Sequence, residues 1–590
     1  MELPQFFRPM RRLFTLIFSL CALVGVVRAE RVSPERAEMV ARQILGEATR
    51  SGDLFVAWDS SIFAPTRVEL VEPTFYVVSP SSGLGFVIVA GDDAVAPILA
   101  YSTTYRAPIS GNLPKNFEGW LRYVDGVVRH LRDKGAKADS ATAQLWSEGY
   151  TPVDALMLNT ARWSQTAPYN NECPIDGDAH SLTGCTQTAM AIIMNHHRWP
   201  ERAKGTTEAY TTKYGLNVAS RSLNHAYDWD NMLETYVDGE YNDLEASAVA
   251  TIMADLGHAF KAEYTATDTG AMPNMLSLYE NFSYSPASAI IVRNGNSDSY
   301  WKGVLRRELE ANRPIFYAGY TAEWAGHAFV LDGVDANDYF HVNWGWGGVY
   351  DGFFLLDSLT LGEEYLFDTQ HWAVLGMHPM RDGEVDNWLV LSSTGLSVNT
   401  REYQRDEQFT IKSISYSNLS QLSFKGEMRV GVCSASGERK SWATEPFGVD
   451  LGTNYATSEQ NIPAIVRDEI VAGDYLAVFY KSNGSESWFR MYGSAESATD
   501  RVVMRYPLIG DTTSLSFDKE SGVLVVEYDD DVRSALYLLG EYVETGVTIT
   551  TGRMIVDTGL LSQGASYTIY LVRPASEESK SIMFTLNDSK

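Results

Sequence analysis

One cysteine lies where the local sequence could make it a nucleophile. In "SLTGCTQTAMAIIMNHHRWP", residues 181–200, Cys185 follows a glycine and precedes residues with helical apolar spacing, which Pro200 brings to an end. We predict a helix over about 186–197. Unpaired N–H groups and the positive dipole end at a helix start favour a thiolate and could stabilise an oxyanion. The alternative is a small cysteine that only packs.

A thiolate nucleophile needs an imidazole that holds the ion pair and protonates the leaving amine. His327, in "AGHAFVLDGVDANDYFHVNWGWGGVYDG", lies 142 residues after Cys185. Papain-like enzymes separate the two residues by roughly 130–150 positions. The spacing therefore favours His327 as the partner.

The residues after His327 predict a β-hairpin around the turn "DAND". If the two strands pair about this turn, His327 lies opposite Trp346, and Asn343 lies one or two steps along the strand from that pair. Asn343 could orient the imidazole, and Trp344 could shield that contact or pack on the ring. The alternatives are a strand-end turn residue for Asn343 and core packing for the tryptophans. His341 is expected on the other face of its strand.

The remaining candidate ligands indicate no metal centre. His196 and His197 end the predicted helix, where cations suit the dipole. No C-x-x-C pair is present, so a structural zinc site is not expected. We expect no metal and no cofactor.

The N-terminus predicts export. Two arginines precede an uncharged, mainly apolar run over residues 13–27, and Val27 and Ala29 suit a cleavage site. This is the pattern of a signal peptide over residues 1–29, and no later segment is long and apolar enough to span a bilayer. Its removal leaves three cysteines, an odd number, so at least one stays free or pairs with another chain. A Cys173–Cys185 disulfide remains open, and it would exclude a nucleophilic Cys185.

The totals describe a multidomain protein. At 590 residues the chain is too long for one core, and its net charge of −28 argues against a nucleic-acid partner. Patterns in the N-terminal part predict a small α+β unit: a helix from "SPERAEMVARQIL" with Ser33 as N-cap, three strands, and a helix ended by Gly135. The polar stretch 136–150 is expected to be an exposed linker. From about 385 the alternation is typical of β-sandwich modules, divided near "RYPLIGDTT".

Three separated motifs resemble the streptopain-type cysteine peptidases, a bacterial branch of the papain-like fold. They are "RWSQTAPYNNECP", "LTGCTQTAMAIIMNHHRWP" and "AGHAFVLDGVDANDYFHVNWGWGGVYDGFF", and "FYVVSPSSGLGFVIVAGDDAVAPILAYST" resembles the propeptide of that family. The likeness covers roughly residues 30–380. It implies an inhibitory propeptide over 30–150 and an α+β papain-like peptidase domain over 151–380. We assign β-sandwich modules to 385–506 and 507–590.

The resemblance also implies residue roles. Cys185 and His327 match the catalytic cysteine and histidine, and Trp344 takes part of the usual third role, with Asn343 a lesser contributor. Gln165 in "WSQ" is our candidate for the side-chain oxyanion donor, beside the Cys185 backbone N–H. The resemblance implies a zymogen cut between residues 136 and 159, and a preference for an apolar residue two positions before the scissile bond.

The chain is thus expected to be a secreted or surface-associated bacterial cysteine endopeptidase, made as a zymogen and acting through an acyl-enzyme intermediate. Its expected partners are protein or peptide substrates and its own propeptide. One alternative is an inactive, peptidase-like adhesin or binding protein acting through the β-modules. Another is a different thiol acyl-transfer enzyme. The presence of both Cys185 and His327 disfavours an inactive scaffold.

Overall fold

The computed structural model divides the chain into two compact units, Met1–Glu384 and Val385–Lys590, which are described separately. The structure describes residues 30–46, 54–63, 72–81, 83–108, 113–150, 155–293, 298–320, 326–356, 371–380, 388–402, 405–468, 470, 473–494, 497–504, 513–518, 521–530, 532–538, 541–562, 564–573 and 578–586. The expected signal peptide and the "RYPLIGDTT" junction lie outside these residues. None of the helices described has the length and hydropathy needed to cross a bilayer.

The N-terminal part of the first unit contains the predicted helices and strands. Helix α2 (Pro34–Leu45) begins where the Ser33 hydroxyl accepts a hydrogen bond from the Arg36 N–H, as a serine N-cap does. Strands β1 (Leu54–Asp59), β2 (Phe75–Pro80), β3 (Phe86–Ala90) and β4 (Ile98–Ser102) follow, with η2 (Ser60–Phe63) between the first two. Helix α3 (Lys115–Lys134) ends at Gly135, which adopts a left-handed φ of 61°.

The expected linker over 136–150 is wrong. Residues Ser140–Glu148 form helix α4, which begins at the N-cap Asp139. Its Trp146 side chain donates from Nε1 to the Val95 carbonyl at 2.7 Å, and the Arg36 guanidinium lies 4.3 Å from its ring centroid. Tyr150 is buried in the hydrophobic cluster that α2 and β1–β4 form, and Trp146 packs against that cluster. Because Trp146 and Tyr150 pack into the N-terminal core although the stretch is mostly polar, α4 belongs with the preceding elements. We call α2, β1–β4, α3 and α4 together the N-terminal body.

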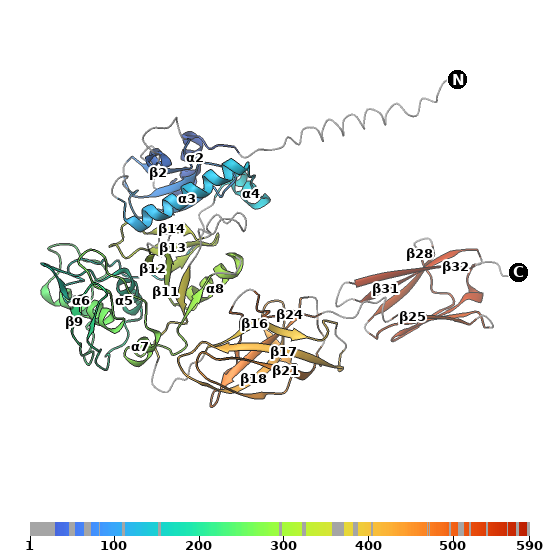
Figure 1. Cartoon of the computed structure of the whole chain (residues 1–590). Coiled ribbons are helices and arrows are strands. Elements are labelled where there is room, and N and C mark those ends of the chain that lie inside the picture. Colours follow the sequence, from blue (N-terminus) through green and yellow to red (C-terminus); the bar gives the residue numbers. More distant parts are fainter. Residues whose placement is uncertain are drawn as a thin grey trace, which may run out of the picture. The chain divides into compact units, whose positions relative to one another are not determined.

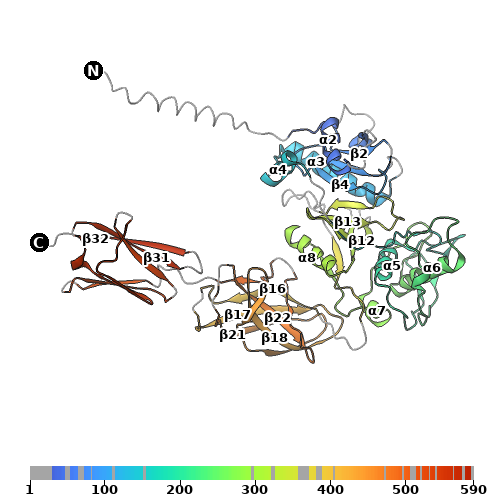
Figure 2. The same ribbon diagram turned by 180° about the vertical axis from the view of Figure 1, so that it is seen from behind.

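A single antiparallel sheet joins the N-terminal body to the rest of the first unit (Figures 1 and 2). Its strand order is β1-β2-β3-β4-β14-β13-β12-β11-β15-β10, and β5 also pairs with β12. The added strands are β5 (Leu156–Met157), β10 (Ala289–Val292), β11 (Ile315–Tyr320), β12 (Gly326–Val334), β13 (Tyr339–Asn343), β14 (Gly352–Leu355) and β15 (Trp372–Leu375). The junction is β4–β14, where Tyr101 pairs with Phe353 and Ala100 with Phe354.

Helices α5 (Cys185–His197) and α8 (Asp298–Glu310) pack against β11 and β12 of this sheet. The same unit contains α6 (Asp243–Ala259) and α7 (Met275–Glu280). Helix α5 packs against β12 and α6, and its Ala189–Met194 stretch is buried in the largest part of the core. Short elements complete the unit: β6 (Ile175–Asp176), β7 (Ala179–His180), β8 (Tyr210–Thr211), β9 (Asn217–Val218) and η3 (Trp229–Asn231).

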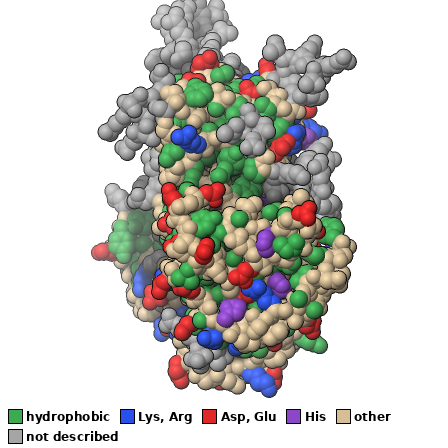
Figure 3. Space-filling model, turned by 90° about the vertical axis from the view of Figure 1, so that its left-hand side faces the viewer, with side chains coloured by type: hydrophobic (Ala, Val, Ile, Leu, Met, Phe, Trp, Pro, Cys, Tyr) green, Lys and Arg blue, Asp and Glu red, His purple; other side chains and the backbone are tan. Residues whose placement is uncertain are grey.

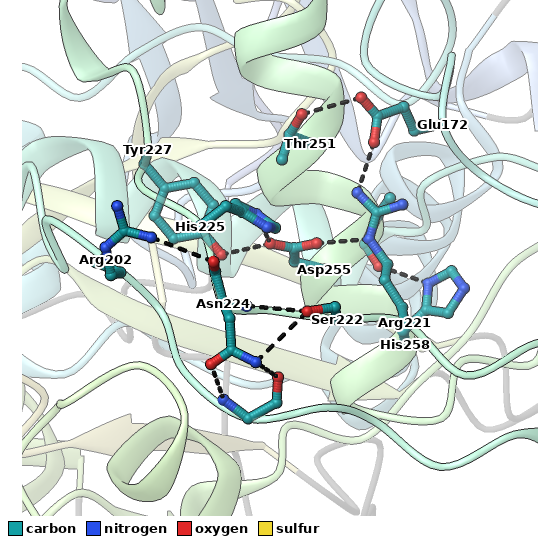
Figure 4. A network of polar contacts seen from close by, with 12 residues as sticks. Glu172, Arg202, Arg221, Ser222, Asn224, His225, Tyr227, Thr251, Asp255 and His258 are labelled. Atoms are coloured by element: carbon teal, nitrogen blue, oxygen red, sulfur yellow. Dashed lines mark hydrogen bonds and ion pairs between the residues drawn. The ribbon is translucent and has the colours of Figure 1, made fainter.

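A buried carboxylate ties the long 200–230 segment to α6 (Figure 4). Asp255, on α6, accepts hydrogen bonds from Arg221 Nε, His225 Nε2 at 2.8 Å and the Tyr227 hydroxyl at 2.7 Å. Glu172 binds the same guanidinium. The hydrogen bond to Asp255 raises the pKa of His225. Because a buried carboxylate is costly unless its oxygens are paired, this network fixes the path of the segment.

The acidic surface gathers into no single site on the face shown in Figure 3. Asp and Glu side chains are spread over that face among hydrophobic and uncharged ones. The net charge of −28 therefore does not mark one anionic patch there.

The second unit consists of β-sheets, as the alternation predicted. One hydrophobic cluster lies between sheet β16-β17-β21 and the sheet built on β19-β18-β22-β23; a second lies between β25-β26-β30-β29 and β28-β27-β31-β32. The strands of the first pair are β16 (Leu389–Val398), β17 (Gln408–Asn418), β18 (Phe424–Cys433), β19 (Arg439–Trp442), β20 (Phe447–Leu451), β21 (Ala456–Ile465), β22 (Tyr475–Ser482), β23 (Phe489–Arg490) and β24 (Val502–Val503). Those of the second pair, with η4 (Thr558–Leu560), are β25 (Ser514–Asp518), β26 (Val523–Glu527), β27 (Arg533–Leu538), β28 (Glu541–Tyr542), β29 (Val547–Thr550), β30 (Arg553–Asp557), β31 (Ser566–Arg573) and β32 (Glu578–Thr585).

One buried aspartate joins the N-terminal body to the β12–β13 turn. Asp335 is fully buried, and its Oδ1 accepts from the backbone N–H groups of Asn337 and Tyr339. Its Oδ2 accepts from the hydroxyls of Tyr101, at 2.9 Å, and Tyr150. Four donors thus satisfy one carboxylate at the junction between the two parts of the unit.

We expect Asp335→Asn to loosen this junction. An amide offers one acceptor oxygen in place of two, so one pair of donors loses its partner, at a cost of about 1–3 kcal/mol. In a Cys185→Ala background, the thermal transition of the full chain, followed by near-ultraviolet circular dichroism, should fall. Tyr101→Phe, which keeps the ring stacked on Phe353 at 5.0 Å, should lower it less. An unchanged transition in Asp335→Asn would contradict the role of this carboxylate.

Candidate active site

Cys185 is the first residue of α5, and the backbone before it is shaped by Gly184. Gly184 has a φ of 88°, in the left-handed region, and a Cβ there would lie 2.6 Å from the Thr269 carbonyl oxygen. Only glycine meets both requirements. The cysteine is therefore presented on a tight entry into the helix, as the local pattern predicted.

The Cys185 thiol is held in its neutral form in this structure. Burial raises its pKa, while hydrogen bonds from the backbone N–H groups of Ala328 and Thr186 oppose the rise. The charge of Asp268 adds to it. The helix N-terminus alone favours a thiolate, but here burial outweighs it.

His327 lies on β12, buried beside two tryptophan rings that stack on each other at 5.2 Å. Its Nε2 is 3.0 Å from the Trp344 carbonyl oxygen, so Nε2 carries the proton. Its ring stacks on Trp346 at 4.9 Å and 22°, and on Trp344 at 6.0 Å and 19°. Burial lowers the pKa of His327 to about 4, and the Trp344 carbonyl only partly opposes this shift. The imidazole is therefore neutral at ordinary pH.

The structure brings the two residues together without joining them. The N–H of Ala328, the residue after His327, acts on the Cys185 thiol, so β12 passes directly beside the start of α5. Within the described residues no hydrogen bond links the thiol and the imidazole. His327 Nε2 donates to the Trp344 carbonyl, which leaves Nδ1 as the nitrogen that can accept a proton.

The hairpin has the predicted register. Val330 pairs with Asn343 and Leu331 with Val342, and a bulge follows before Gly333. Carried along the hairpin, this register puts Trp346 opposite His327, consistent with the stacking of the two rings. The register set by the β12–β13 turn thus places Trp346 beside the imidazole of His327.

The Asn343 amide is not placed on the imidazole. Its Nδ2 donates to Thr160 Oγ1 at 3.0 Å and to the Ala161 carbonyl at 2.9 Å, and its Oδ1 accepts from the Gly345 N–H. These bonds shape the turn that presents Trp344. Sequence reasoning recognised the residue but not its partners, because Thr160 lies 183 residues away in the chain.

His341 corrects a second expectation. Residues two apart on a strand share a face, and His341 and Asn343 both reach one buried network. His341 Nδ1 is 2.6 Å from Asp332 Oδ1, and Asp332 Oδ2 accepts from Thr160 Oγ1. The Asp332 carboxylate raises the pKa of His341 against the effect of burial.

Two glutamines lie near Cys185. The carbonyl oxygen of Gln165 accepts from the N–H of Thr183, two residues before the cysteine, and Gln165 is partly exposed. Gln187, two residues after Cys185 on α5, is fully buried, and neither the nitrogen nor the oxygen of its amide has a hydrogen-bond partner. Sequence reasoning did not single out Gln187; its place in "GCTQT" was the available signal.

The N-terminal body packs on the aromatic residues that enclose His327. Phe117, on α3, stacks on Tyr350 at 5.2 Å and meets Trp344 edge-on at 5.8 Å. Trp120, one turn along, meets Phe354 edge-on at 5.3 Å. A chain of ring contacts thus leads from α3 through Trp344 to the imidazole.

The described cysteines are all free thiols, which excludes the Cys173–Cys185 disulfide in this structure. Cys173 is buried, and burial raises the pKa of its thiol to about 12. Among the described residues no group of three His, Cys, Asp or Glu side chains is arranged to hold a metal ion.

The fold and the comparisons with known proteins define a cysteine endopeptidase made with an inhibitory propeptide. Residues 163–354 match the model of the peptidase C10 family, and residues 29–128 match the Spi protease inhibitor model. The chain belongs to the peptidase C10 family. The resemblance to streptopain-type peptidases noted in the sequence is confirmed.

Individual relatives and one solved structure match large parts of the chain. Streptopain of Streptococcus pyogenes is 32% identical over 413 residues, which cover 62% of this chain and 99% of streptopain. The thiol protease/hemagglutinin PrtT of Porphyromonas gingivalis is 28% identical over 507 residues, covering 81% of this chain and 57% of PrtT. The solved structure of a prointerpain A fragment from Prevotella intermedia is 26% identical, with a TM-score of 0.44, and covers 53% of this chain and 98% of the fragment.

The protonation states of the site predict slow alkylation of the precursor. Because burial raises the pKa of the Cys185 thiol, its thiolate fraction should stay small at neutral pH and grow only above the ordinary range of a thiol. A cysteine paired with imidazolium keeps its thiolate well below pH 7, so the processed enzyme should react at least about tenfold faster at pH 6. Iodoacetamide labelling followed by intact mass measures both forms. Cys185→Ala corrects for Cys173 and Cys433, and equal rates would contradict the prediction.

Proposed function

We propose that Cys185 is the nucleophile and His327 the general base and acid of this peptidase. The observation that carries the proposal is the position of β12, which brings His327 and Ala328 beside the N-terminus of α5. In the active form the imidazole takes the thiol proton, and the thiolate attacks the scissile carbonyl carbon. The imidazolium then protonates the leaving amine, and an acyl-enzyme remains. Water, deprotonated by His327, hydrolyses the thioester and restores the thiol.

In this proposal the oxyanion is bound by the Cys185 backbone N–H and the Gln165 side-chain amide. The N–H of the first residue of a helix has no partner within the helix, and the hydrogen bond between Gln165 and Thr183 keeps the glutamine beside Gly184. Gln187 is less suited, because its amide is fully buried. Trp344 shields the imidazole from water and Asn343 holds the turn that presents Trp344.

Inhibition by the propeptide is assigned to the aromatic contact at Trp344. Phe117 is fully buried against the residues around His327, and the β4–β14 pairing continues the peptidase sheet into the propeptide. We propose that this packing holds the aromatic residues around His327 in their present arrangement, and that removal of the propeptide lets the imidazole move into an ion pair with Cys185.

We also propose limits for the domains. The propeptide would span 30–150, the peptidase 151–380, and the β-modules 385–506 and 507–590. A cut between 136 and 159 would release the propeptide; residues 136–139, between α3 and α4, are irregular, and Lys137 and Asp139 are exposed. A signal over residues 1–29 would deliver the chain outside the cell or to its surface, and an apolar residue two positions before the scissile bond would be preferred. Protein substrates suit this enzyme, and the net charge of −28 disfavours nucleic acid.

Cys185→Ala and His327→Ala should abolish both casein cleavage and self-shortening of the full chain. Each change removes one half of the proton-transfer pair, and triad-type residues that act as a unit lose about 10⁴–10⁶-fold in kcat when one is removed. Gel analysis under reducing conditions follows the shortening, and Cys173→Ala serves as the matched control with full activity. Wild-type activity in Cys185→Ala would mean that the nucleophile is elsewhere.

Gln165→Ala should lower kcat by about 10²–10³-fold with little change in KM, since an oxyanion donor acts mainly in the transition state. Gln187→Leu should leave kcat nearly unchanged, and removing a buried, unpaired amide should not destabilise the fold. Steady-state kinetics with a fluorogenic peptide separate the two variants. The reverse result would assign the oxyanion to Gln187.

A further inference from the structure

The segment between β13 and β14 carries both tryptophans that pack on His327. We call residues 344–351 the 344–351 loop. Its backbone is unusual at Tyr350, which has a φ of 69°, in the left-handed region that residues with a Cβ rarely adopt. Such a conformation persists only where the surrounding structure holds it. The contacts that hold this loop therefore decide where Trp344 and Trp346 lie.

Asp351, the last residue of the loop, binds the first. It is 1% exposed, and its Oδ1 accepts a hydrogen bond from the Trp344 backbone N–H at 3.0 Å. The indole Nε1 of Trp344 donates to the Tyr350 carbonyl at 3.1 Å. On the other side of Trp344, the Gly345 N–H donates to Asn343 Oδ1 at 3.1 Å. The peptide groups before and after Trp344 are thus both held.

Trp344 in turn holds the imidazole. Its carbonyl oxygen lies 3.0 Å from His327 Nε2, and its ring stacks on the imidazole at 6.0 Å. Because the hydrogen bond at one ring nitrogen decides the tautomer, this contact leaves Nδ1 as the nitrogen that can accept the thiol proton. A displaced Trp344 would turn the ring and move that nitrogen. Two consecutive hydrogen bonds therefore lead from Asp351 to the proposed general base.

Asp351 can accept its hydrogen bond in either protonation state. Burial raises its pKa to about 7, although the charges of His341 and Arg162 lower it; the charge of Asp332 adds to the rise. At neutral pH the ionised and neutral forms are both present, and each has an oxygen that accepts from an N–H group. The acceptor oxygen is therefore the feature on which the loop depends.

We propose that Asp351 is a positioning residue for the peptidase reaction, which holds Trp344 so that the Trp344 carbonyl orients His327. The proposal rests on the function proposed above for His327 and adds a residue outside the reacting pair. Within the described residues Asp351 makes no hydrogen bond to Cys185 or His327, so it acts through Trp344. Because a misplacement of about 1 Å can cost about 10²-fold in rate, losing this hydrogen bond should lower kcat about 10- to 100-fold.

The test compares Asp351→Leu with Asp351→Asn in the full chain after its own processing. Both variants keep the approximate size of the side chain, but only the amide keeps an acceptor for the Trp344 N–H. With a fluorogenic peptide, Asp351→Leu should lower kcat about 10- to 100-fold and change KM by less than about threefold, because substrate contacts are intact. Asp351→Asn should stay within about threefold of the wild type in both.

The pH profile of Cys185 alkylation separates positioning from a general loss of stability. In processed Asp351→Leu the profile should move to higher pH, because a displaced imidazole no longer stabilises the thiolate, whereas Asp351→Asn should keep it. Asp474→Leu is the matched control, since Asp474 is fully buried in the other compact unit, and it should change neither kcat nor the profile. A wild-type kcat and profile in Asp351→Leu would overturn the proposal, as would equal losses in Asp351→Leu and Asp351→Asn.

Two further variants keep the test decisive. If Asp351→Leu shows no cooperative thermal transition, Asp351→Glu takes its place. Its carboxylate is carried on a side chain longer by one methylene, so Trp344 is displaced and kcat should fall at least about tenfold. A wild-type kcat in folded Asp351→Glu would then contradict the positioning role. Full activity in His327→Ala would instead show that the general base is elsewhere, so a failure of the proposed function is recognised separately.

Discussion

The packing of two indole rings on one imidazole is the contact on which the rest of the site depends. His327 is buried against Trp344 and Trp346, which also stack on each other, and its Nε2 donates to the Trp344 carbonyl. Burial without a counter-charge keeps the ring neutral, with a pKa of about 4. The precursor therefore holds the Cys185 thiol and the His327 imidazole near each other, both in their neutral forms.

The inhibitory segment acts on the surface that holds this contact. Strand β4 extends the peptidase sheet at β14, Asp335 accepts from two tyrosines of the N-terminal body, and Phe117 packs on Trp344. In the proposed mechanism, inhibition and catalysis therefore share one hydrophobic and hydrogen-bonded junction. Releasing the N-terminal body would remove aromatic contacts from the residues packed on His327 and would thereby couple release to a change at the imidazole.

Local patterns predicted the elements that carry the site. Helical spacing and Pro200 located α5, and the "DAND" turn gave the register in which His327 faces Trp346, since turn geometry determines hairpin pairing. The same reasoning failed where a residue's partner is far away in the chain. Helix α4 resembled a linker because its anchors, Trp146 and Tyr150, find their partners in the N-terminal core.

By itself, the sequence determined the order of the parts, the presence of a cysteine at a helix start and a histidine in a hairpin, and the family they belong to. These depend on residue types at short spacing. Only the tertiary structure decided that Asn343 binds Thr160 rather than the imidazole, and that Gln187 is buried without a partner. The reason is physical: burial and the approach of distant backbone set the protonation state of each group, and no local pattern encodes either.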